Sequence, residues 1–134
     1  MSASRRLALG ALAALALATS AVSEEWPQIL GPHRNGSVES ERGLAAWGAQ
    51  GPRELWRQSV GEGVAGPVSV GERLLLFHRL DDQEVLAALS VEDGSTLWQT
   101  GSPTAYRDDV GFDEGPRAPP TVDAGAVFTH GAEG

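Results

Sequence analysis

The chain has 134 residues, enough for one small domain, with 18 acidic residues, ten arginines and neither lysine nor cysteine. Its formal net charge of −8 repels phosphate backbones and anionic lipid, which argues against sequence-independent binding to nucleic acid. The absence of cysteine excludes disulfides, cysteine-ligated zinc, thiol catalysis and an acylated N-terminal cysteine. Seventeen glycines and eight prolines favour a turn-rich chain built from strands.

Residues 1–23 have the three parts of a secretory signal peptide. Arg5 and Arg6 give a positive start, residues 7–18 are Leu and Ala except for one glycine, and small residues follow. The apolar run is too short to span a bilayer, which needs about 20 helical residues. We therefore expect cleavage before Glu24, by the general secretory or the twin-arginine route, and an exported protein that is periplasmic or extracellular. We expect no integral membrane segment after signal removal.

The middle of the chain predicts four short strands separated by turns. Residues 67–70 alternate, residues 74–78 form a continuous apolar run, and two further strand-length segments follow at 84–90 and 95–100. The last turn ends in Asp-Gly, a strong hairpin signal. The sequence thus predicts an antiparallel meander. One such sheet cannot bury both of its faces, so we expect it to be a repeat packed against neighbours.

Internal similarity supports a repeat. Leu55-Trp56 recurs as Leu97-Trp98, 42 residues later, which is close to the roughly 40–45 residues of a propeller blade. Residues 120–123 then repeat the 67–70 pattern in altered form. That second offset is 53 residues, so the second unit carries an insertion of 11 residues. The insertion falls between Gly101 and Arg117.

Three segments carry a family resemblance. Residues 93–98 resemble, with shortened spacing, the D-x-x-T-G-x-x-x-W signature of quinoprotein-like (pyrroloquinoline-quinone-like) β-propeller repeats. Residues 26–36 look like the N-terminal start of a secreted subgroup of that family, and residues 104–117 look like one of its loops. The resemblance covers essentially everything after residue 24. It implies an all-β fold of four-stranded antiparallel meander blades, eight in the full-length propeller, with about one and a half present here.

The signal-peptide pattern, the predicted strands and the resemblance together give a domain plan. It reads 1–23 signal peptide, 24–52 largely irregular N-terminal segment, 53–60 candidate ring-closing strand, 64–100 first blade, 101–117 acidic inserted loop and 118–134 start of a second, truncated blade. Trp56 and Trp98 would dock one blade on the next, a structural role. An incomplete ring would expose sheet faces and long edges, so we expect the chain to be a fragment of a larger propeller.

The acidic inserted loop is the densest polar segment. Its candidate binding residues are Asp108, Asp109, Asp113, Glu114 and Arg117. Four carboxylates there could ligate Ca²⁺, but the spacing is not that of an EF-hand. The alternative is a solvated insertion whose acids cap turns and pair with arginines. No metal motif, phosphate loop or nucleophile elbow is visible, so we assign no catalytic, cofactor-binding or metal-binding residue.

Two functions follow from the resemblance. The first is an exported binding or scaffold module for an unknown protein or small-molecule ligand. The alternative is the N-terminal part of a quinone-dependent alcohol dehydrogenase that uses PQQ and calcium. In that enzyme class the cofactor-stacking aromatics, the calcium site, a catalytic Asp and often a vicinal disulfide come from several blades, and none can be placed on this sequence. We predict the binding module.

Overall fold

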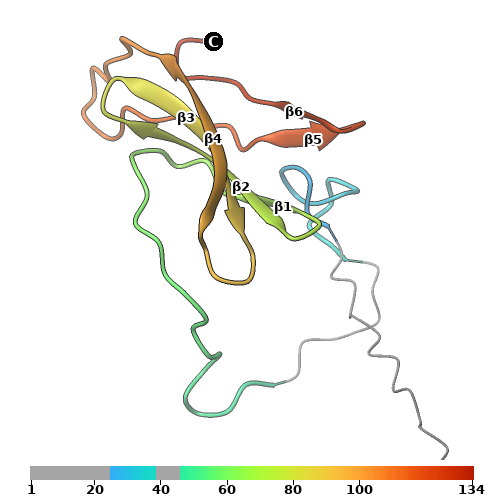
Figure 1. Cartoon of the computed structure of the whole chain (residues 1–134). Coiled ribbons are helices and arrows are strands. Elements are labelled where there is room, and N and C mark those ends of the chain that lie inside the picture. The colour runs from blue at the N-terminus through green and yellow to red at the C-terminus, as the bar shows by residue number, and fades with distance from the viewer. Residues whose placement is uncertain (1–24, 39–45) are drawn as a thin grey trace, which may run out of the picture.

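The computed structural model describes residues 25–38 and 46–134 (Figure 1). The predicted signal peptide and its cleavage point lie outside these residues. The described chain is all-β: six strands form a four-stranded and a two-stranded sheet, with no helix among these residues. A search of the same residues for a helix long and apolar enough to cross a membrane finds none.

The four-stranded sheet is the predicted antiparallel meander, in the order β1-β2-β3-β4. Its strands are β1 (Val68–Val70), β2 (Arg73–Leu80), β3 (Gln83–Ser90) and β4 (Thr96–Pro103). Two-residue turns join β1 to β2 and β2 to β3, as shown by the closing pairs Val70↔Arg73 and Leu80↔Gln83. The fold prediction is confirmed at this level, and β4 continues three residues past the predicted end at 100.

The turn between β3 and β4 follows the Asp-Gly signal. Gly94 takes a φ of 72°, which an L side chain rarely adopts, and its N–H donates to the Ser90 carbonyl at 2.9 Å. The Asp93 carboxylate accepts hydrogen bonds from the Ser95 N–H and hydroxyl at 3.0 and 2.8 Å. A bulge near Ala88 and Leu89 offsets the pairing of the two strands.

The core lies on one face of this sheet. Val68, Leu75 and Ala88 are almost fully buried there, and Val122 and Val127 pack against them. The two valines belong to the hairpin of β5 (Thr121–Asp123) and β6 (Ala126–Phe128), which pairs antiparallel through a two-residue turn. This second hairpin therefore covers the sheet rather than extending it (Figure 1).

The N-terminal segment ties the two sheets together. Trp26 exchanges backbone hydrogen bonds with Ser69 on β1, and the Pro27 carbonyl accepts from the Val122 N–H of β5 at 2.8 Å. The Trp26 ring lies against Gly31, where a Cβ atom would approach it to 2.8 Å. Gly31 is therefore needed both for its φ of 78° and for its missing side chain.

The candidate ring-closing strand at 53–60 is not a strand in the described structure. A strand needs a neighbouring backbone, and this segment pairs with none of the described strands. It is held instead by Trp56, whose indole N–H donates to the Val91 carbonyl at 2.8 Å and whose ring lies against Gly94. Trp98 lies on β4 opposite Ala88 and is 41% exposed. Blade docking by either tryptophan stays a prediction.

Candidate functional site

The acidic inserted loop folds back onto the β2–β3 end of the sheet. It leaves β4 after Pro103 and rejoins the strands at β5. Its first residue beyond β4, Thr104, is buried and donates its N–H to the Asp82 carbonyl in the β2–β3 turn at 3.0 Å. The loop therefore begins beside a turn that is more than 20 residues away along the chain.

Arg79 of β2 joins this turn to both arms of the loop. Its side chain is only 3% exposed. The guanidinium donates to the carbonyls of Asp81 at 2.6 Å, Tyr106 at 2.8 Å and Glu114 at 3.2 Å. Buried charge is costly unless it is fully hydrogen-bonded. The carbonyls of the turn and of the loop supply most of the partners that let an arginine sit here.

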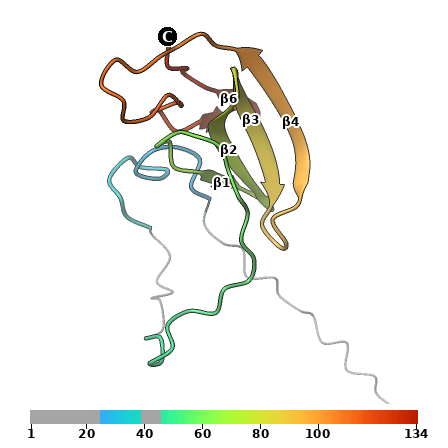
Figure 2. The same ribbon diagram turned by 90° about the vertical axis from the view of Figure 1, so that its left-hand side faces the viewer.

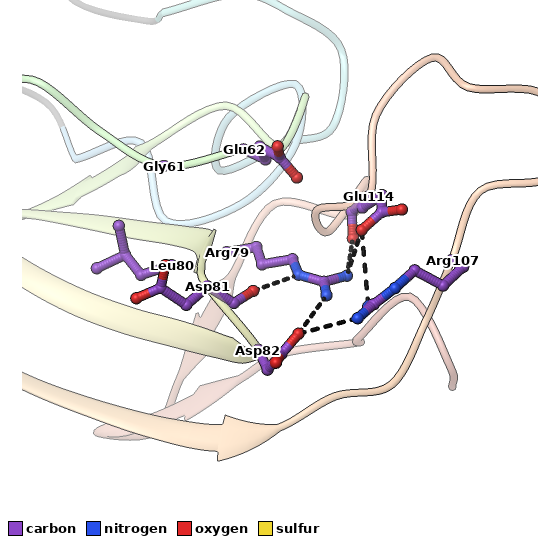
Figure 3. A pocket seen from close by; sticks show the side chains of 8 residues that line it. All are labelled: Gly61, Glu62, Arg79, Leu80, Asp81, Asp82, Arg107 and Glu114. Carbon is purple, nitrogen blue, oxygen red and sulfur yellow. Dashed lines mark hydrogen bonds and ion pairs between the residues drawn. The ribbon is translucent and has the colours of Figure 1, made fainter.

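Arg79, Asp82, Arg107 and Glu114 form a ring of four charged side chains that alternate in sign (Figure 3). Asp82 Oδ1 lies 3.2 Å from Arg79 Nη2 and 3.0 Å from Arg107 Nη2. Glu114 Oε2 lies 3.4 Å from Arg79 Nη1 and 3.6 Å from Arg107 Nη1. The hydrogen bond and charge of Arg107, more than those of Arg79, hold the pKa of Asp82 below its ordinary value. We name these four residues the charge ring.

An open hollow of about 480 Å³ lies beside the charge ring (Figure 3). Its lining comes from the 61–62 segment, the end of β2, the β2–β3 turn and both arms of the loop: Gly61, Glu62, Arg79, Leu80, Asp81, Asp82, Arg107 and Glu114. Four carboxylates face two guanidiniums, so the lining is polar with an excess of negative charge. A second hollow of about 420 Å³ shares Asp82 and Arg107 with the first.

Two of the predicted loop residues, Asp108 and Asp113, hold the fold of the loop through hydrogen bonds to its backbone. Asp108 Oδ2 accepts from the Phe112 N–H at 2.6 Å, and this bond holds the pKa of Asp108 below its ordinary value. Asp113 accepts from the Gly115 and Gly63 N–H groups at 2.8 and 3.2 Å. Carboxylates that cap backbone N–H groups shape a turn.

Arg117 clamps the two arms of the loop. Its guanidinium lies 5.4 Å from the centre of the Tyr106 ring and donates to the Tyr106 hydroxyl at 3.0 Å. That hydrogen bond is the main reason why the pKa of Arg117 is raised. Arg117 also contacts Asp108 Oδ1 at 3.5 Å. The sequence alternative in which loop acids cap turns and pair with arginines describes these contacts.

The structure thus divides the five candidates. Glu114 lines the hollow and Asp109 lies on the exposed loop tip. Asp108 and Asp113 cap backbone N–H groups of the loop, and Arg117 contacts Tyr106 and the Asp113 carbonyl. Sequence reasoning missed Arg79, Asp82 and Glu62. An arginine next to the end of an apolar strand, with two aspartates in the turn that follows, was the available signal for the first two. Glu62 offered none, because its place depends on an isolated pairing with Arg79.

The described residues offer no ready metal site. No three or more His, Asp or Glu side chains come together there in a way that could hold a metal ion. Asp108 and Asp113 accept hydrogen bonds from backbone N–H groups, and Asp108 also contacts Arg117, so these two carboxylates do not fit the role of calcium ligands. His78 is a packed histidine: its Nδ1 accepts from the Gly61 N–H at 2.8 Å, and burial lowers the pKa of His78.

No family model matches this chain, and no curated protein or solved structure matches it significantly. The fold class of this protein is therefore assigned from its own structure. That geometry is an all-β chain with a four-stranded antiparallel meander and a polar hollow at one end of the sheet.

Proposed function

We propose that this chain is part of an exported β-propeller of the quinoprotein-like kind and that it acts as a binding or scaffold module. The complete meander β1–β4 is the strand arrangement of one blade. The β5–β6 hairpin occupies the sequence positions of the first two strands of a second blade. The resemblance of residues 26–36, 93–98 and 104–117 supplies the family.

Exposed apolar side chains on the outer strand support packing against a further sheet. Leu97 and Trp98 on β4 are 51% and 41% exposed, and Phe128 on β6 is 59% exposed. Fully burying a large apolar side chain stabilises a protein by about 1.5–3 kcal/mol. Neighbouring blades would bury these residues, and Trp98 would then take the docking role expected of it.

The hollow beside the charge ring carries the proposal of binding. Arg79 fixes both arms of the loop to the end of the sheet, so the polar groups of the hollow stand on a rigid base. Loops anchored in this way on a rigid scaffold commonly carry binding sites. The excess of carboxylates favours a polar or positively charged group as the bound part of the ligand.

Site-specific photo-crosslinking tests the binding module. A photoreactive residue at Glu62, exposed beside the hollow, is compared with one at Val91 in the turn at the opposite end of the sheet, in cells that export the protein. We expect a discrete adduct from position 62 only, identified by mass spectrometry and lost in Arg107→Ala. The same adducts from both positions would contradict a site at the hollow.

The enzyme alternative is tested on the same purified protein. PQQ, calcium and a primary alcohol are added, and reduction of an electron-accepting dye is followed. The binding module predicts no dye reduction above the level without PQQ. Export is tested separately by N-terminal sequencing of the secreted product, for which we expect Glu24 as the first residue.

A further inference from the structure

The outer edge of β4 is the long free strand edge of the described structure. β4 is the outer strand of the four-stranded sheet (Figure 2). It is hydrogen-bonded only to β3, and all eight of its residues are exposed. The opposite side of the sheet is covered differently. Trp26 pairs with β1 at Ser69, and Glu62 pairs with β2 at Arg79. An uncovered edge presents unpaired N–H and C=O groups that can accept another strand.

Charged side chains commonly protect a strand edge from pairing with another chain, and β4 has no charged side chain. Its sequence, Thr-Leu-Trp-Gln-Thr-Gly-Ser-Pro, contains no Asp, Glu, Lys or Arg. The other two eight-residue strands carry charge: Arg73 and Arg79 on β2, and Glu84 on β3. Pro103, at the very end of β4, is the single residue without an N–H, and it limits the length of the pairing rather than preventing it.

Charge selects the occupant of this edge. Two copies of a chain with a net charge of −8 repel each other wherever their acidic surfaces meet. They can approach through β4 because no like charges face each other there. A basic partner would gain nothing from β4, since its attraction is to the acidic turns and loop. An uncharged extended strand can pair with this edge without charge repulsion, and β4 of a second copy is such a strand.

We propose that β4 pairs antiparallel with β4 of a second copy, giving a homodimer with one continuous eight-stranded sheet. The two-fold axis passes near the middle of the strand, at the pair formed by Thr100 and its own copy, so that pairing extends over most of its length. Trp98, Thr100 and Ser102 alternate onto one face. Each therefore meets polar or aromatic side chains of the same set across the axis. The proposal is independent of the propeller assignment, because it uses the strand edge and not the sheet face.

Charge exchange at Thr100 tests the pairing. Thr100→Lys and Thr100→Glu each place like charges near the two-fold axis, so each should weaken self-association by about tenfold. An equal mixture of the two variants should restore association, because opposite charges then face each other. A variant that merely disturbed the fold could not be rescued in this way. Val64→Lys is the control, since Val64 is 68% exposed and lies beyond β2, away from β4.

Sedimentation velocity of the exported chain, from micromolar to submillimolar concentration, gives the readout. We expect a monomer–dimer equilibrium that strengthens as salt screens the net charge. Amide hydrogen exchange on β4 should also slow with concentration. A wild-type chain that stays monomeric throughout would overturn the proposal. So would a dimer that both Thr100 variants leave unchanged, or a mixture of the variants that associates no better than either alone.

Discussion

Arg79→Ala should release the acidic inserted loop from the sheet. The substitution removes hydrogen bonds to the carbonyls of Tyr106 at 2.8 Å and Glu114 at 3.2 Å, one on each arm of the loop. A hydrogen bond that involves a charged group contributes about 1.5–3 kcal/mol. Removing one partner of a buried ion pair costs about 3–5 kcal/mol. Because Glu114 keeps Arg107 and is partly exposed, we expect the lower part of this range, about 3 kcal/mol.

Urea unfolding and trypsin digestion measure this effect. The free energy of unfolding should fall by about 3 kcal/mol, and cleavage after Arg107 and Arg117 should accelerate as the loop opens. Arg107→Ala is the matched control, because Arg107 belongs to the same charge ring but is 56% exposed. It should cost less than about 1 kcal/mol, as exposed ion pairs do. Equal losses in the two variants would refute the role given to the buried guanidinium.

Three further predictions follow from single contacts. Gly94→Ala should destabilise the chain by about 1–3 kcal/mol more than Gly71→Ala, since both have positive φ but only Gly94 touches the Trp56 ring; urea unfolding gives both values, and equal losses would argue against that contact. Asp108 has a lowered pKa, so its contribution to stability is present above pH 3.8 and lost as the pH falls below it; proteolysis of the loop should rise there, and Asp108→Asn should remove this pH dependence. The pKa of His78 is also lowered, so the contribution of His78 to stability is present above pH 6.5 and is lost as the pH falls below that value. The free energy of unfolding measured across this range should show the loss in the wild type and not in His78→Gln.

The meander could be predicted because its signals are local. Apolar runs of strand length and turn residues at fixed spacing define β2, β3 and their turns without reference to the rest of the chain. The segment 53–60 shares its Leu-Trp pair with β4, but a strand exists only with a partner backbone, and sequence does not show which backbone lies beside it. Pattern reasoning therefore located strands where neighbours in sequence are neighbours in space.

The candidate site could be predicted only in part for the same reason. The acidic loop was visible as a run of carboxylates, and Glu114 does line the hollow. The partners of Arg79 lie 27 and 35 residues further along the chain, at Tyr106 and Glu114. Composition also could not distinguish carboxylates that cap the loop, such as Asp108, from those open to a ligand. Local spacing defines which groups are present, whereas the fold of the loop decides which way they face.

A crystal structure of the complete exported product tests the propeller assignment most directly. We predict further four-stranded meanders arranged around one axis, with a neighbouring blade over Trp98. Segment 53–60 should then be paired with the last blade, where it would close the ring. A structure in which β1–β4 packs only against the β5–β6 hairpin, with no further meander and Trp98 still exposed, would contradict the assignment.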